Sequence, residues 1–123
     1  MKTVHFVRHG ETEQNKDGIW QGHTNTQLSK TGKAQAKLLS KRINLKNQTV
    51  FTSDLARAKE TAYFLSDSPN VRENLREINV GDFTGKSVKE TYSNNLDIFD
   101  ALQYDTYVFP NGESVQELSL IHI

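Results

Sequence analysis

Residues 3–10 read Thr-Val-His-Phe-Val-Arg-His-Gly, and this stretch indicates how the chain folds. Five residues that are mostly β-branched or aromatic stop abruptly at Arg8, a pattern typical of a buried strand that runs into a loop. Residues 49–52 form a second short run of the same kind. We therefore predict that both runs are strands of one sheet.

Apolar residues recur at three- and four-residue spacing in two segments, and this predicts helices over about residues 30–43 and 54–66. Ser53 is placed to cap the second helix, because its hydroxyl can accept a hydrogen bond from a free backbone N–H of the next turn. A short strand is expected at 71–72, an irregular loop at 76–85, and short helices near 87–92 and 96–102. Strands that alternate with helices predict an α/β fold with parallel strands covered on both faces.

The composition limits the classes of function. The chain has 123 residues, which suits a single domain, and its 15 Lys and Arg balance 15 Asp and Glu. A net charge of zero argues against binding of the whole protein to nucleic acid or to an anionic membrane. No cysteine is present, so disulfides and Cys-based metal sites are excluded. Because no long apolar run or signal peptide is visible, we expect a cytoplasmic protein, while the oligomeric state stays open.

Three charged or nucleophilic side chains are expected to meet at one edge of the predicted sheet. Arg8 and His9 follow the first strand directly, and Arg57 lies in the first turns of the helix after the second strand. The carboxyl ends of parallel strands share an edge, so these groups would form a compact site for an anion such as phosphate.

The chemistry of such a site suggests phosphoryl transfer. Nearby positive charge favours the neutral imidazole of His9, which can attack phosphorus and form a phosphohistidine. The leaving alkoxide then needs a proton, and Glu77 in the irregular loop is the candidate donor.

Plainer interpretations of the same residues exist. An Arg-His-Gly tripeptide occurs often by chance, and Arg57 could lie on a solvated helix face. Glu77 could form a surface ion pair with Arg76, a contact worth roughly 0–1 kcal/mol.

Other residues with chemical potential carry weaker signals. His5 and His9 are four residues apart, but on a strand and its end rather than on a helix, so a metal site is not expected. Trp20 is interpreted as an anchor of its loop rather than as a platform for bases. His23 is interpreted as a loop residue with a minor role or none.

Five ordered stretches resemble the histidine phosphatase superfamily, in its phosphoglycerate mutase-like branch. The stretches span most of the chain, and their combination is far more specific than any one of them. They are VRHGET (7–12), QGHTNTQLSKTG (21–32), TSDLARAKETA (52–62), LREINVGDFTG (75–85) and PNGES (110–114).

The resemblance implies a fold and a role for each matching position. The fold would be a three-layer αβα sandwich with a mostly parallel, mixed sheet, incomplete at its C-terminal end. His9 would be the phosphorylated nucleophile and Glu77 the proton donor and acceptor. The phosphoryl group and substrate would be bound by Arg8, Asn15, Gln21, Gly22 and Arg57. No metal or organic cofactor is implied, and the substrate would be a small phosphorylated metabolite.

The short acid-bearing loop, residues 77–85, is more similar to broad-specificity and α-ribazole-type phosphatases than to phosphoglycerate mutases. The resemblance therefore favours phosphomonoester hydrolysis through a phosphohistidine. Phosphoglycerate mutase activity is the alternative within the family. The non-enzymatic alternative is a fragment that binds phosphate through Arg8 and Arg57 without catalysing a reaction.

One expected part of the family's pocket is missing. The family has a second histidine, usually followed by glycine, at the end of a later strand, and this sequence has only His122 after residue 23. We therefore interpret residues 1–117 as the N-terminal part of one histidine phosphatase domain. The chain as given is expected to be poorly stable and nearly inactive.

The last six residues, LSLIHI (118–123), are interpreted as a non-native tail. They equal one reading frame of the mosaic-end adapter that is used in transposon-based sequencing libraries. Sequencing of the locus from an independent library would test this interpretation.

Overall fold

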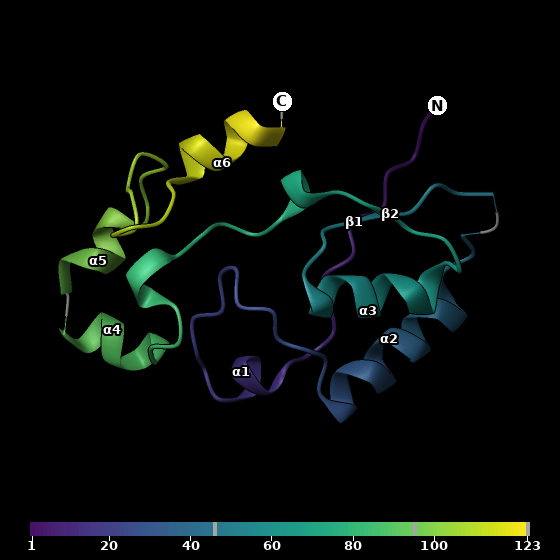
Figure 1. Ribbon diagram of the computed structural model, residues 1–123, viewed down its shortest axis with the longest axis horizontal. Helices are drawn as coiled ribbons and strands as arrows, with labels where there is room; N and C mark the ends of the chain where they lie inside the picture. The colour runs from purple at the N-terminus through teal and green to yellow at the C-terminus, as the bar shows by residue number, and fades with distance from the viewer. Residues whose placement is uncertain (46, 95, 123) are drawn as a thin grey trace.

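The computed structural model describes residues 1–45, 47–94 and 96–122, and its elements form two sides joined by a connecting segment (Figure 1). On one side, helices α2 (Lys30–Arg42) and α3 (Ala56–Leu65) pack beside strands β1 (Phe51–Thr52) and β2 (Asn70–Val71). On the other side lie α4 (Val88–Asn94), α5 (Leu96–Ala101) and α6 (Val115–His122). A short helix, α1 (Glu13–Lys16), and two 3-10 helices, η1 (Glu73–Leu75) and η2 (Gly81–Phe83), complete the elements.

The two strands are parallel, as the alternation of strands and helices predicts. Phe51 pairs with Asn70 and Thr52 with Val71, and α3 forms the crossover between them. The backbone N–H of Asn70 donates to the carbonyl of Val50 at 2.8 Å, and that of Arg72 donates to Thr52 at 2.8 Å. The α/β class is therefore confirmed, with these two strands as the only named strands of the described residues.

The prediction of a buried strand at residues 3–7 is wrong. These residues have no strand partner, and the side chains of Val4 and Phe6 are 71% and 96% exposed. A strand needs a neighbour to satisfy its backbone groups and a layer to cover its apolar side chains. No other segment of the described residues pairs with this one, so its β-prone composition alone does not produce a strand.

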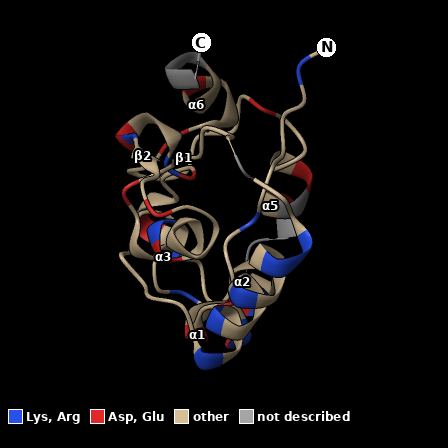
Figure 2. Ribbon diagram, turned by 90° about the vertical axis from the view of Figure 1, so that its right-hand side faces the viewer, with Lys and Arg blue, Asp and Glu red and all other residues tan. Residues whose placement is uncertain are grey.

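Helix α2 matches its prediction closely. The Ser29 hydroxyl accepts from the backbone N–H of Gly32 at 3.0 Å and so caps the first turn. Gly32 lets the loop after His9 approach the helix, because a Cβ at this position would lie 2.0 Å from the carbonyl oxygen of Glu11. Figure 2 shows lysines and an arginine along α2, which contains no acidic residue.

Helix α3 begins later than the sequence predicts. The N-cap is Leu55, which is extended at φ −66° and ψ 135° and makes no side-chain capping bond. The predicted cap at Ser53 is therefore wrong: residues 54 and 55 form a bend before the helix begins at Ala56, and Ser53 is buried instead. Leu55 and Ala62 are buried on the expected apolar stripe, while Ala58 and Leu65 are partly buried.

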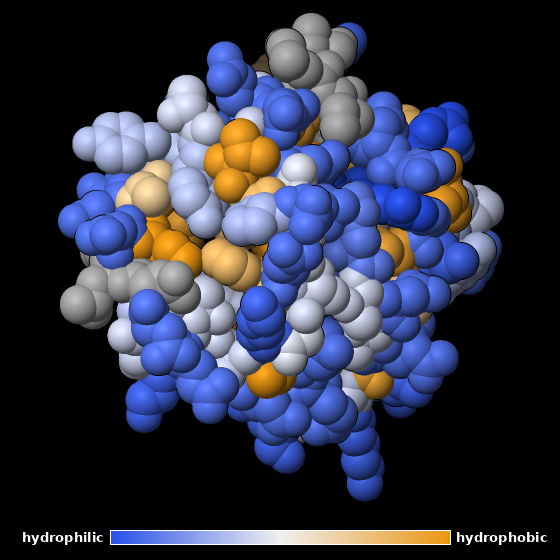
Figure 3. Space-filling view, turned by 60° about the vertical axis from the view of Figure 1, so that its left-hand side comes forward, coloured by the Kyte–Doolittle hydropathy of each residue, from blue (hydrophilic) through white to orange (hydrophobic). Residues whose placement is uncertain are grey.

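An aromatic cluster forms the second interior, on the α4–α5 side. Its buried members are Val80, Phe83, Ile98 and Phe109, and Trp20 packs against them. The ring centroids of Phe83 and Phe109 lie 5.5 Å apart in an edge-to-face arrangement, and those of Trp20 and Phe109 lie 5.8 Å apart. The interpretation of Trp20 as a loop anchor is confirmed. Figure 3, which brings this side forward, shows apolar side chains in separate places within a mostly hydrophilic surface.

The C-terminal helix α6 runs from Val115 to His122 and so includes most of the tail interpreted as non-native. The Ser114 hydroxyl accepts from the backbone N–H of Glu117 at 3.0 Å at its start. The non-native origin of residues 118–123 stays a prediction. Among the residues that the structure describes, no helix is long and apolar enough to pass through a bilayer.

Candidate active site

Arg57 is the centre of the candidate site. It lies in the first turn of α3, and its side chain is only 1% exposed. The guanidinium donates to the carbonyl oxygens of Thr24 and Gly22, each at 2.7 Å, and to the Glu77 carboxylate at 3.1 Å. A solvated helix face is thereby excluded for Arg57. Arginine has five N–H donors, and those left over, including that on Nε, have no acceptor among the described residues.

His9 is held beside Arg57 by the residue that follows it. The backbone N–H of Gly10 donates to the Thr61 hydroxyl at 3.0 Å, and that hydroxyl donates to the carbonyl of Arg57 at 2.8 Å. Gly10 is buried against α2, where a Cβ would lie 2.4 Å from the carbonyl oxygen of Gly32. The loop after residue 8 is therefore fixed to both helices, although residues 3–7 form no strand.

The tautomer of His9 follows from its one ring contact. Nδ1 lies 2.8 Å from the carbonyl oxygen of Gly10, and because a carbonyl only accepts, Nδ1 carries the proton. Nε2 of the neutral ring then has a free lone pair. Burial lowers the pKa of His9, and the charges of Arg57 and Arg8 lower it further, against the opposing effects of the Gly10 carbonyl and Glu77. The sequence argument named only the arginines, whereas desolvation is the larger cause.

Glu77 reaches this centre from the connecting segment between η1 and η2. Its side chain is 53% exposed, and its Oε2 accepts from Arg57 at 3.1 Å. The alternative of a surface pair between Glu77 and Arg76 is absent from the ion pairs of the described residues, because Arg76 contacts Asp54 and Glu73 instead. The bidentate contact with Arg76 lowers the pKa of Asp54 and raises that of Arg76. This contact ties the segment before Glu77 to the loop before α3.

The remaining predicted residues differ in their placement. Asn15 and Gln21 both face the buried Thr12: its hydroxyl lies 3.1 Å from Asn15 Oδ1 and 2.8 Å from Gln21 Oε1. Both amide NH2 groups are without an acceptor in the part of the chain that the structure describes. Gly22 is buried with φ +48°, and its carbonyl accepts a hydrogen bond from Arg57. Arg8 is exposed and forms no hydrogen bond with the described residues, although its charge acts on His9.

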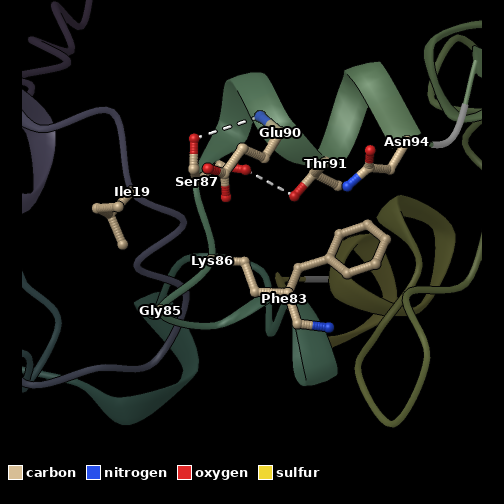
Figure 4. A pocket seen from close by; sticks show the side chains of 8 residues that line it. All are labelled: Ile19, Phe83, Gly85, Lys86, Ser87, Glu90, Thr91 and Asn94. Atoms are coloured by element: carbon tan, nitrogen blue, oxygen red, sulfur yellow. Dashed lines mark hydrogen bonds between the residues drawn. The ribbon is translucent and has the colours of Figure 1, made fainter.

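Among the hollows that the described residues form on the surface, one adjoins Glu77 and another borders α4. The first, of about 350 Å³, is lined by His23, Glu73, Asn74, Arg76, Glu77, Glu113 and Leu118. The second borders α4 and contains none of the predicted site residues (Figure 4). Its lining is Ile19, Phe83, Gly85, Lys86, Ser87, Glu90, Thr91 and Asn94. Here the backbone N–H of Glu90 donates to the Ser87 hydroxyl and the Thr91 hydroxyl donates to the Ser87 carbonyl, and these bonds close the first turn of the helix.

Sequence reasoning missed the residues that support this centre. Thr61 and Thr12 are buried and use their hydroxyls to position Gly10, Asn15 and Gln21. His23 was assigned a minor role or none, yet its Nε2 lies 2.7 Å from the carbonyl oxygen of Glu77. No spacing or composition signal in the sequence identifies these contacts, because each depends on how two loops meet.

Comparison with known proteins gives consistent matches. A family model described as "Histidine phosphatase superfamily (branch 1)" matches residues 4–119. A probable phosphatase of Schizosaccharomyces pombe is 42% identical over 71% of this chain and 44% of its own length. A putative phosphoserine phosphatase of Hydrogenobacter thermophilus is 34% identical over 80% of this chain and 51% of its own length.

A solved structure shares the arrangement of the elements. The mycobacterial glucosyl-3-phosphoglycerate phosphatase complexed with VO3 is 26% identical, with a TM-score of 0.85 over 92% of this chain and 59% of that one. The chain therefore spans about half the length of the two curated relatives and somewhat more of this structure.

Proposed function

Because the chain belongs to the histidine phosphatase superfamily (branch 1), we propose that it hydrolyses small phosphomonoesters through phosphorylation of His9. One observation carries this proposal: His9 presents an unprotonated Nε2 next to a buried arginine that has unused N–H donors. An imidazole with a lowered pKa stays neutral, and hence nucleophilic, at neutral pH.

In the first step, Nε2 of His9 attacks phosphorus, and the bond from phosphorus to the ester oxygen breaks. The free N–H groups of Arg57 bind phosphoryl oxygens, and the exposed Arg8 adds positive charge from the solvent side. The amide groups of Asn15 and Gln21 supply neutral donors. Glu77, in its protonated form, gives its proton to the departing alkoxide, so the alcohol leaves uncharged.

In the second step, water attacks the phosphohistidine. The Glu77 carboxylate takes a proton from this water, the nitrogen–phosphorus bond breaks, and inorganic phosphate leaves with His9 restored. The position of Glu77 supports this role, because its carboxylate already contacts the same guanidinium group that would hold the phosphoryl oxygens. The phosphatase names of the relatives support hydrolysis as the outcome.

The experiment is an assay on the full product of the gene beside residues 1–123, since the chain spans about half the length of its curated relatives. The protein is incubated with phosphomonoesters, and free phosphate is measured with and without 2,3-bisphosphoglycerate. We expect phosphate release that His9→Asn abolishes. Transfer between 2- and 3-phosphoglycerate that is strongly stimulated by the bisphosphate would identify a mutase instead. Binding of phosphate without either reaction would identify a non-catalytic fragment.

A further inference from the structure

His23 belongs to a loop that contacts both Arg57 and Glu77, and we propose that it is a positioning residue for Glu77. It would fix the backbone of Glu77 and thereby aim its carboxylate at the leaving group. This inference rests on the proposed function, in which Glu77 is the proton donor. It gives a defined task to a residue that the sequence leaves without one.

The contact between His23 and Glu77 has a fixed direction. Nε2 lies 2.7 Å from the carbonyl oxygen of Glu77, and because that oxygen can only accept, Nε2 must carry a proton. The contact therefore forms with the neutral Nε2–H ring and with the protonated ring alike. It also leaves Nε2 of His23 without a lone pair, so this nitrogen is not a second nucleophile.

The backbone on both sides of His23 is fixed by Arg57. The carbonyls of Gly22 and Thr24 each accept from the guanidinium at 2.7 Å. The loop is thus attached to Arg57 by its backbone and to Glu77 by its side chain. With the Arg57–Glu77 contact at 3.1 Å, these bonds close a ring that links the phosphate-binding group to the acid.

Glu77 needs such support because its own side chain has little. The carboxylate is half-exposed, and Arg57 is its one partner among the described hydrogen bonds. The neighbouring anchors act on other residues: Arg76 contacts Asp54, and the backbone N–H of Asn79 donates to Glu113 at 2.8 Å. Within the described residues, the bond from His23 is the only hydrogen bond to the backbone of Glu77 itself.

The test compares leaving groups. A departing alkoxide from glycerol 3-phosphate needs a proton from Glu77, whereas p-nitrophenolate leaves without one. The variants are His23→Leu, which removes the donor, and His23→Gln, whose amide N–H reaches the place of Nε2. His5→Leu is the matched control, because His5 is exposed and outside the site. Glu77→Gln shows how large the difference between the two substrates is when the proton donor is lost. All of these variants are made in the full gene product.

We expect His23→Leu to lower kcat for glycerol 3-phosphate about fivefold to tenfold more than kcat for p-nitrophenyl phosphate. His23→Gln should restore most of the loss, and His5→Leu should leave both rates unchanged. The inference would be overturned if His23→Leu lowered kcat equally for both substrates, or not at all, while Glu77→Gln lowered kcat more for glycerol 3-phosphate than for p-nitrophenyl phosphate. If Glu77→Gln lowers kcat equally for the two substrates, the result contradicts the role of Glu77 as proton donor, and with it the proposed function.

A second measurement needs no turnover. Long-range proton–nitrogen NMR spectra of the protein with labelled histidine report the tautomer of each ring. We expect a proton on Nε2 of His23, and a change in the Glu77 carbonyl resonance in His23→Leu but not in His5→Leu. If the neutral ring of His23 carries its proton on Nδ1, the inference is overturned. This result would count even if the protein were inactive, because the measurement does not need turnover.

Discussion

The two sides of the molecule differ in the largest side chains that they bury, although the α2–α3 side also buries the apolar Leu28, Ala36, Leu55 and Ala62. On the α2–α3 side, buried side chains include Arg57, Thr61 and Thr12, and each is held by directional hydrogen bonds. On the α4–α5 side, Val80, Phe83, Ile98 and Phe109 form a buried apolar cluster in which aromatic rings meet edge to face, and Thr91 and Ser114 are the buried polar residues described there. The predicted catalytic groups gather on the polar side. Directional bonds place particular atoms, whereas apolar contacts supply stability with little control over direction.

The segment after η1 joins the two interiors over a few residues. Glu77 contacts Arg57 on the polar side, and Val80 is buried in the aromatic cluster three positions later. The segment that carries the acid to the polar centre is therefore continuous with the aromatic cluster. Three pairs of variants and one pH series test this division of tasks.

The largest effect is expected from Phe109→Ala, in the middle of the aromatic cluster. Removing a buried aromatic ring leaves a cavity and should lower the free energy of unfolding by about 4 kcal/mol. Phe109→Leu keeps most of the volume and should cost about 1.5 kcal/mol or less. Urea denaturation measures both. Phosphorylation of His9 per folded molecule should be unchanged, and a loss of phosphorylation larger than the loss of folded protein would break the comparison.

Arg57→Met tests the polar interior. It leaves the carbonyls of Gly22 and Thr24 buried without a donor, which should cost about 3 kcal/mol in the free energy of unfolding. Unlike the change at Phe109, it should also abolish phosphorylation in the molecules that remain folded. Arg42→Met, at the exposed end of α2, is the control and should change neither. Phosphorylation that survives in Arg57→Met would remove Arg57 from the site.

Alanine substitutions at Gly22 and Gly18 test the close contact between the two interiors, with Gly18 as the control. Both have positive φ, but a Cβ at Gly22 would lie 2.8 Å from Val80 Cγ2, whereas one at Gly18 would have nothing within 4 Å. Gly18→Ala should cost about 1 kcal/mol for the backbone conformation alone. Gly22→Ala should cost about 2 kcal/mol, because the contact adds to it. Equal thermal unfolding shifts in the two variants would show that the close approach to Val80 carries no energy.

The pH dependence of His9 phosphorylation is the smallest effect. A lowered pKa means that the imidazole stays neutral to a lower pH than an ordinary histidine, whose pKa is about 6.5. The initial rate of phosphorylation should therefore hold as pH falls to about 6.5 and decline only below that value. Quenched-flow rates at constant ionic strength measure it. A decline that begins above this value would mean that burial and the two arginines do not determine the direction of the pKa shift of His9.

The sequence predicts much of the local structure on the polar side, for physical reasons that the individual residues make clear. Helix α2 has a regular apolar period and a serine cap, and both are local signals, so its range agrees within one residue. The placement of His9 near Arg57 was predicted from two parallel strands. The contact arises instead through Gly10 and Thr61, since residues 3–7 pair with no strand.

What the sequence could not predict depends on contacts between distant loops. The partners of Arg57 are mainly backbone carbonyls, which carry no residue signature, and the tautomer of His9 depends on one carbonyl oxygen. Ser53 has the right residue type for a cap, but the chain bends at residues 54 and 55 and the helix begins only after Leu55. The contact of His23 with Glu77 joins residues 54 positions apart.

The most direct test of the account is the site of phosphorylation. The full gene product is mixed with a phosphomonoester, quenched in base to preserve phosphohistidine, and analysed by mass spectrometry and phosphorus NMR. Because Nδ1 of His9 donates to Gly10, the account predicts phosphate on Nε2 of His9 and none in His9→Asn. Phosphate on Nδ1 of His9 or on another residue, or phosphate release without any phosphoenzyme, would contradict it.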